Sequence, residues 1–68
     1  MKLPEYMEEV WAEGRLLELQ EEARNSGGDM DIMEETHLEA DQIICKLLEQ
    51  AGFDSVVSRY NKVPKGYL

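Results

Sequence analysis

The sequence predicts an all-α fold: an antiparallel helical hairpin followed by a short third helix, in a single domain that spans residues 1–68. Apolar residues recur every three or four positions and do not alternate as they would in a strand. The one convincing linker, Asn-Ser-Gly-Gly at 25–28, separates two long amphipathic segments. A chain of 68 residues is also too short for two domains. We therefore expect helices over about 4–25, 31–51 and 55–62.

The first helix is expected to begin near Pro4, since proline suits the first helical position. Glutamates in the following turns suit the positive end of the helix dipole. Gly14 is expected on the buried side, where it would let another helix approach closely; the alternative is a local weakness in the helix. The residues at three- and four-residue spacing, expected on one face, are Leu3, Met7, Val10, Gly14 and Leu17.

The second helix shows the strongest periodicity. Asp29 or Asp31 can cap its N-terminus, and Gly52 suits a left-handed C-terminal cap. Its apolar stripe is expected to face the core and consists of Met33, His37, Ala40, Ile44, Leu47 and Ala51, widened by Ile43 and Leu48.

The third helix is expected to be short, with Asp54 or Ser55 as its cap and with Val56, Val57 and Tyr60 as its apolar residues. It should end before Pro64, because the residue that precedes a proline avoids helical dihedral angles.

The charge distribution restricts the possible partners. The chain carries 15 acidic against 7 basic residues, a net charge of −8. Direct nucleic-acid binding requires a basic surface, so it is not expected, and anionic membranes are disfavoured for the same reason. The longest apolar run, residues 43–45, is too short to cross a bilayer, and the single cysteine forms no internal disulfide. These features predict a cytoplasmic protein.

The acidic surface predicts a protein partner with a basic surface. Carboxylates would steer the chain towards that surface, and an aromatic residue, Trp11 or Tyr67, would anchor it. The acidic residues of this predicted site are Glu8, Glu9, Glu13, Asp29, Asp31, Glu34 and Glu35. A homodimer is also expected as an alternative, because Tyr6, Trp11 or Leu16 could remain as an outer apolar patch, and two hairpins would make a four-helix bundle.

No catalytic residue, cofactor or metal site is predicted. His37 and Asp41, one helical turn apart, could supply two metal ligands, but two make a weak site. The competing interpretation pairs His37 with Asp41 or Glu34 as an ion pair. Cys45 is expected in the core as a small apolar residue.

Two groups of residues resemble known families. Glu18, Glu21 and Glu22, together with Glu39 and Asp41, resemble the paired acidic motifs of MazG-like all-α nucleotide pyrophosphohydrolases, although Leu38 stands where that family has a glutamate. This resemblance implies carboxylates from adjacent helices that hold magnesium against a triphosphate. A structural subunit that only dimerises is a further alternative.

Residues 37–68 are similar to the C-terminal segment of small uncharacterised proteins of bacteriophages and prophages. The likeness rests on His-Leu-Glu-Ala-Asp at 37–41, Gly52-Phe53, and the ending Val-Pro-Lys-Gly-Tyr-Leu at 63–68. It implies a phage accessory protein that inhibits host or defence machinery stoichiometrically, as anti-CRISPR proteins do.

Overall fold

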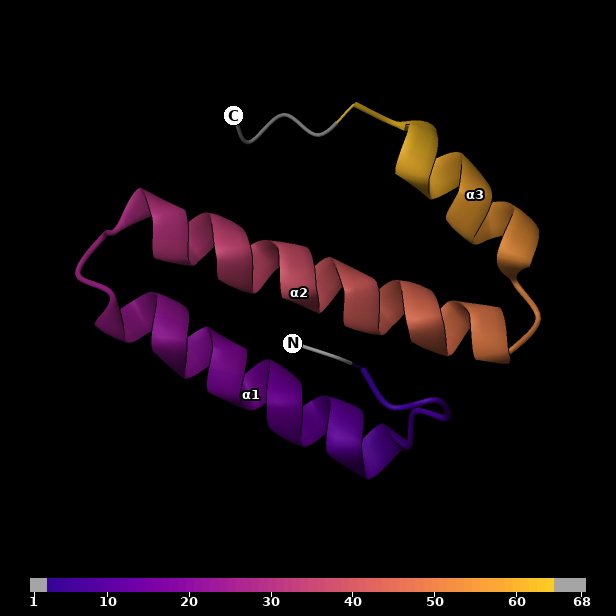
Figure 1. Ribbon diagram of the computed structural model, residues 1–68, viewed down its shortest axis with the longest axis horizontal. Coiled ribbons are helices and arrows are strands. Elements are labelled where there is room, and N and C mark those ends of the chain that lie inside the picture. Colours follow the sequence, from indigo (N-terminus) through magenta and orange to yellow (C-terminus); the bar gives the residue numbers. More distant parts are fainter. Residues whose placement is uncertain (1–2, 65–68) are drawn as a thin grey trace.

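Residues 3–64, which the computed structural model describes, form three α-helices that lie side by side (Figure 1). α1 (Glu9–Asn25) and α2 (Met30–Gln50) are antiparallel, and α3 (Asp54–Lys62) packs along the other side of α2. The molecule measures 37 × 29 × 15 Å, so the helices make a flat layer with α2 in the middle. The all-α hairpin with a short third helix is confirmed, and the described residues contain no strand.

The N-terminal segment differs from the prediction, because α1 begins at Glu9 and not near Pro4. Residues 3–8 form a non-helical N-terminal arm instead, and Met7 in this arm is only 2% exposed. The backbone N–H of Met7 donates to Gln50 Oε1, and Gln50 Nε2 donates to the Met7 carbonyl at 3.0 Å. A helix that started at Pro4 would lose both bonds, which close the open end of the hairpin.

α1 turns a different face to the core from the predicted one. Ala12 and Leu19 are buried, whereas Val10 is 79% exposed and Leu17 is also exposed. Leu3 and Met7 contact the core as predicted, but from the arm. The predicted face was wrong for Val10, Gly14 and Leu17, because the spacing that begins at Leu3 does not continue along the helix. Gly14 is exposed as well, and a Cβ there would meet no atom within 4 Å, so it permits no close helix approach.

The boundaries of α2 follow the predicted signals. The Asp29 carboxylate caps its N-terminus by accepting the backbone N–H groups of Asp31 at 2.9 Å and Ile32 at 3.1 Å. Gly52, just after the helix, has φ +94°, as a left-handed cap requires. Gly27 and Gly28 also have positive φ in the turn before it.

The residues through which α2 meets the core differ in part from the predicted stripe. Ile43 and Thr36 are buried, and Ala40 and Leu47 pack at or beside the core. Met33, His37 and Ile44 are exposed, although they belong to the predicted stripe. The strip of α2 that faces the core therefore overlaps the predicted stripe at Ala40, Ile43 and Leu47 and is rotated away from Met33, His37 and Ile44.

α3 buries Val57 against α2 and leaves Val56 exposed. Its N-cap is Phe53, without a side-chain cap hydrogen bond, so the prediction of Asp54 or Ser55 as the cap was wrong. The helix ends at Lys62, before Pro64, as expected. Within residues 3–64, no helix has both the length and the apolarity that crossing a bilayer requires.

Candidate protein-binding site

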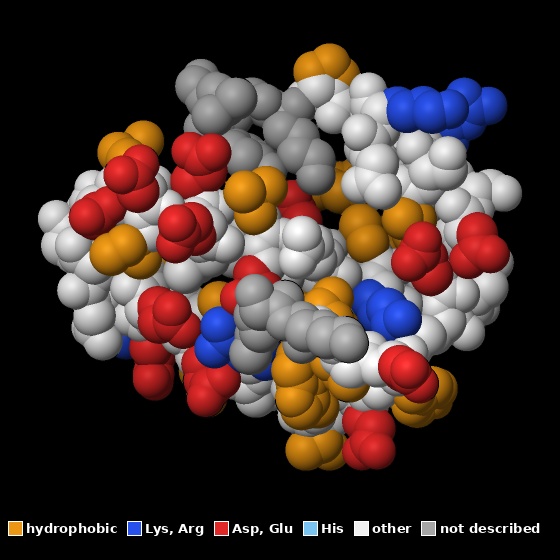
Figure 2. Space-filling model, in the orientation of Figure 1, with side chains coloured by type: hydrophobic (Ala, Val, Ile, Leu, Met, Phe, Trp, Pro, Cys, Tyr) orange, Lys and Arg blue, Asp and Glu red, His pale blue; other side chains and the backbone are white. Residues whose placement is uncertain are grey.

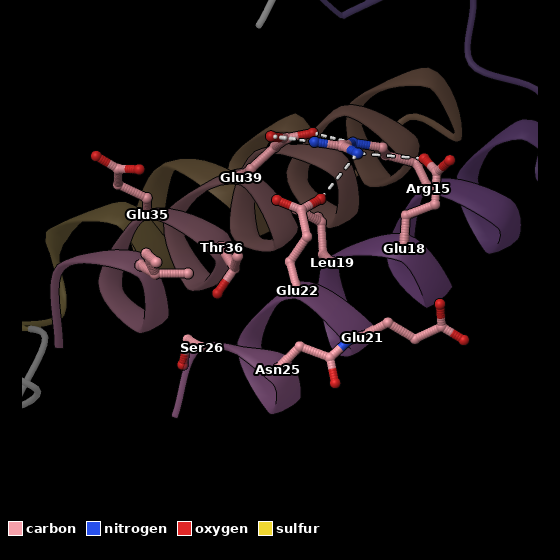
Figure 3. Close-up of a pocket in the computed structure, with 11 residues that line it drawn as sticks. Arg15, Glu18, Leu19, Glu21, Glu22, Asn25, Ser26, Glu35, Thr36 and Glu39 are labelled. Atoms are coloured by element: carbon pink, nitrogen blue, oxygen red, sulfur yellow. Dashed lines mark hydrogen bonds and ion pairs between the residues drawn. The ribbon is translucent and has the colours of Figure 1, made fainter. Parts of the chain in front are cut away.

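A bidentate ion pair joins the two long helices. Arg15 on α1 donates through Nε to Glu39 Oε2 at 2.6 Å and through Nη2 to Glu39 Oε1 at 3.0 Å (Figure 3). The two side chains are only 17% and 16% exposed. Nη1 of the same guanidinium also contacts Glu18 at 3.2 Å and Glu22 at 3.3 Å. Arg15 thus holds three carboxylates from two helices around one cation.

The ion pair fixes the charge state of both partners. The hydrogen bond from Arg15 lowers the pKa of the Glu39 carboxyl, and this effect exceeds the opposing effect of partial burial. The hydrogen bond to Glu39 in turn raises the pKa of Arg15. Both groups therefore remain charged at neutral pH.

An acidic groove lies between α1 and α2, on the side towards the turn that joins them. It has a volume of about 660 Å³, with Leu19 and Thr36 among the residues that line it. Its five carboxylates belong to Glu18, Glu21, Glu22, Glu35 and Glu39. Figure 2 shows acidic side chains gathered over this end of the hairpin. Among the described residues that line the groove, Arg15 is the one cation, against five carboxylates.

The predicted acidic site residues fall into two groups. Glu8, Glu9 and Glu13 are exposed at the start of α1, whereas Asp29, Asp31, Glu34 and Glu35 lie at the start of α2. Because the helices are antiparallel, these groups stand at opposite ends of the hairpin, about 25 Å apart, the length of a 17-residue helix. Of the seven residues, only Glu35 lines the acidic groove.

The two predicted aromatic anchors differ in position. Trp11 is half-buried and packs against the core that includes Met7 and Ile43, so only part of its ring can reach a partner. Tyr67 lies outside the described residues. Trp11 does not line the acidic groove.

Sequence reasoning did not identify Arg15 as a site residue. Its spacing to Glu18 is a recognisable helical ion pair, which could have indicated a local contact. Its stronger contact, with Glu39 24 residues away, depends on the register of the hairpin, which no local pattern specifies.

The carboxylates that resemble the pyrophosphohydrolase motif come together only in part. Glu18, Glu21, Glu22 and Glu39 line the acidic groove, but the Arg15 guanidinium occupies the space between three of them. Asp41 lies in a separate hollow beside α3, where it accepts the Tyr60 hydroxyl at 3.1 Å.

His37 Nε2 lies 3.8 Å from Asp41 Oδ1, the contact that the ion-pair interpretation expects. Among the described residues, no three His, Cys, Asp or Glu side chains are grouped so as to hold a metal ion. Cys45 is only half-buried, with Sγ 4.0 Å from Asn61 Oδ1, so it lies between α2 and α3 and not deep in the core.

Comparison with known proteins adds no relative to these observations. No protein family, curated protein or solved structure matches the chain.

Proposed function

We propose that the protein is a non-enzymatic binding module whose acidic groove docks on a basic protein surface. The observation that carries the proposal is that five carboxylates line one groove, with a single arginine among them. Arg15 is paired with Glu39 and contacts one carboxylate oxygen each of Glu18 and Glu22. The exposed carboxylates of Glu21 and Glu35, together with the second oxygens of Glu18 and Glu22, remain for a partner. A partner arginine would suit them, because its planar fork binds two carboxylate oxygens at once.

The remaining acidic residues would act at longer range. Carboxylates at the two ends of the hairpin, such as Glu9 and Asp31, are exposed and lie away from the groove. Charges at the rim of an interface mainly raise the association rate, so these residues would steer a basic partner towards the groove.

A basic surface of this kind commonly binds a polyanion. A protein that covers it competes with that polyanion one for one, which is stoichiometric inhibition. The resemblance of residues 37–68 to small phage proteins supports this reading, in which the chain acts in a host cytoplasm on a nucleic-acid-binding host or defence protein.

The proposal is tested with an oligo-arginine peptide as the basic probe, binding being followed by calorimetry and by backbone amide shifts. In the groove variant, Glu18, Glu21, Glu22 and Glu35 are each replaced by glutamine. In the matched control, which removes the same charge, the same replacement is made at Glu8, Glu9, Glu13 and Glu49. We expect the groove variant to weaken binding by about tenfold or more, and the control by a few-fold at most. Equal weakening by both variants would mean that net charge alone attracts the probe, and the groove would lose its role.

Salt provides a second test with the same probe. Raising the ionic strength from low to physiological should slow association, because screening shortens the range of the steering field. An association rate that does not change with salt would contradict the electrostatic part of the proposal.

The alternative is a magnesium-dependent pyrophosphohydrolase, which the grouping of Glu18, Glu21, Glu22 and Glu39 favours. Incubation with nucleoside triphosphates and Mg²⁺ distinguishes the two functions. Release of pyrophosphate that is lost in Glu21→Gln or Asp41→Asn would support the enzyme and overturn the binding module.

A further inference from the structure

α2 carries an apolar stripe that α1 covers only along one edge. α1 packs around Ile43 and Thr36, while Asp41 and Cys45 face α3. The stripe lies between these two contact surfaces, and Met33 and Ile44 within it are 44% and 46% exposed. We call it the α2 seam, and it consists of Met33, His37, Ala40, Ile44, Leu47 and Ala51.

The spacing of the α2 seam is that of a coiled coil. Its residues alternate strictly between steps of four and three, which gives the period of 3.5 residues that keeps a seam facing a second helix. A helix that only lies on a globular core normally shows a wider stripe with a period of 3.6. The pattern therefore suits a helix partner along the whole seam.

Apolar surface continues from the seam onto the neighbouring helices. An adjoining apolar groove of about 330 Å³ includes Leu16 and Ala23 of α1 together with Met33 and Ala40 of the seam. On the other side, Tyr60 of α3 donates to the same Asp41 oxygen that His37 contacts. Exposed apolar residues stand on the Tyr60 side of α3, at helical spacing from it: Phe53, Val56 and Val63.

The chain exposes more surface than a typical monomer of its mass, and the excess is close to the area that each subunit of a dimer buries. The chain exposes 5332 Å². A folded monomer of its mass, 7.8 kDa, exposes roughly 4,400 Å² by the general scaling of surface with mass. The excess of about 900 Å² is close to the roughly 800 Å² that each partner contributes to a stable interface.

We propose that a second copy of the chain covers the α2 seam, with the two α2 helices antiparallel about a two-fold axis. In this register Ala40 lies opposite Ile44 of the partner subunit, and Ala51 opposite Met33 of the partner subunit. His37 then lies opposite Leu47 of the partner subunit. Each small residue thus faces a large one, as well-packed cores require, and the contact is the same from either subunit.

Charge and side-chain size favour a second copy of the chain as the partner, and an antiparallel over a parallel pair of α2 helices. The seam contains no acidic or basic residue apart from His37, so a chain of charge −8 can meet itself there without opposing carboxylates along the seam. In a parallel pair, Ala40 would face its own copy and leave a void, and the two His37 rings would meet. The acidic groove lies on the opposite flank of α2, where Glu35 and Glu39 project, so it stays open in the dimer. The dimer would then present two acidic grooves.

Sedimentation equilibrium of the full chain over the micromolar range tests the proposal. We expect a mass approaching twice 7.8 kDa for the natural sequence and the single-chain mass for Ile44→Glu. The matched control is Val10→Glu, which places the same charge on an exposed apolar residue of α1 and should leave the dimer intact. Circular dichroism verifies that Ile44→Glu stays helical, as its half-exposed position predicts. A natural sequence that remains monomeric, or an Ile44→Glu chain that is folded and still dimeric, would overturn the proposal.

Cysteine pairing tests the register in a background that carries Cys45→Ser. Chains with Ala40→Cys mixed with chains with Ile44→Cys should give mainly the mixed disulfide, since the antiparallel register places these positions opposite each other. Disulfides formed chiefly within the Ala40→Cys population would indicate a parallel pair and refute the register.

The effect of salt distinguishes dimerisation from the proposed binding function. Screening should strengthen the association of two like-charged chains and weaken the binding of the oligo-arginine probe.

Discussion

At the residue scale, the Arg15–Glu39 ion pair is the main polar link between α1 and α2. Its bidentate geometry and low exposure distinguish it from an ordinary surface pair, which contributes little. We expect Arg15→Met, which keeps the apolar stem, to lower the free energy of unfolding by about 1–2 kcal/mol at neutral pH, because Glu39 would be left half-buried without its partner. Urea unfolding measures the change. Arg24→Met, at an exposed site in the last turn of α1, is the control and should change stability much less.

The same pair predicts a pH dependence with a definite sign. Arg15 holds the pKa of the Glu39 carboxyl below its ordinary value of 4.5 in the folded state. The stabilisation is therefore complete above that ordinary value and is lost as the pH falls through the lower, folded-state pKa. The difference in unfolding free energy between the natural chain and Arg15→Met should shrink as the solution is acidified below pH 4.5. A difference that is constant from neutral to acidic pH would show that the guanidinium acts only through packing.

At the scale of the elements, the four glycines in residues 3–64 have two different roles, one within a helix and the other in turns. Gly14 lies exposed within α1, where glycine costs about 1 kcal/mol relative to alanine, and a Cβ there meets nothing. Gly14→Ala should therefore raise the free energy of unfolding by roughly 0.5–1 kcal/mol. Gly52→Ala should lower it, because φ there is +94°. Thermal unfolding of both variants checks the opposite signs; a destabilising Gly14→Ala would contradict the exposed position of Gly14.

The N-terminal arm gives a second prediction at this scale. Its attachment depends on the two hydrogen bonds between Met7 and Gln50, which hold Met7 over the core. We expect Gln50→Ala to cost about 1–2 kcal/mol of stability and to speed hydrogen exchange at the Met7 amide. Gln42→Ala, at an exposed site of the same helix, should change neither quantity. Unchanged protection of Met7 in Gln50→Ala would mean that packing alone holds the arm.

The elements that were predicted well are those whose signals are local. Both ends of α2 could be predicted because their signals are local. The Asp29 cap accepts hydrogen bonds from residues two and three positions further on, and Gly52 follows the last turn directly. The start of α1 could not be predicted in this way. Pro4 is a valid local signal, but the contact of Met7 with Gln50, 43 residues away, overrides it. The site follows the same rule: its acidity was evident, whereas the convergence of two helices on Arg15 depends on tertiary register.

At the scale of the whole molecule, the flat shape explains why part of the apolar stripe of α2, which was predicted to face the core, is exposed. α2 lies between α1 and α3 in one layer, so its two sides are covered and the stripe between them is covered only along the edge that faces α1. The periodicity of the α2 seam predicts helix pairing, but among residues 3–64 only its edge at Ala40 and Leu47 packs against the core, and Met33 and Ile44 stay exposed. A pattern in one helix predicts that a surface is buried and does not say by which element.

The net charge of −8 acts on the whole layer and predicts how salt affects folding. Repulsion among 15 carboxylates destabilises the compact state, and screening relieves it. Screening also weakens the ion pairs, but among residues 3–64 each pair other than Arg15–Glu39 has one exposed side chain, and pairs of this kind are worth no more than about 1 kcal/mol each.

The relief of repulsion should therefore prevail, and the thermal midpoint should rise between low and physiological NaCl. A chain in which Glu8, Glu9, Glu13 and Glu49 are replaced by glutamine carries less of this repulsion and should show a smaller rise. The measurement is made on the Ile44→Glu background, because there a change in dimerisation cannot raise the midpoint by mass action. A midpoint that falls with salt would show that ion pairs, and not repulsion, dominate the electrostatics of this fold.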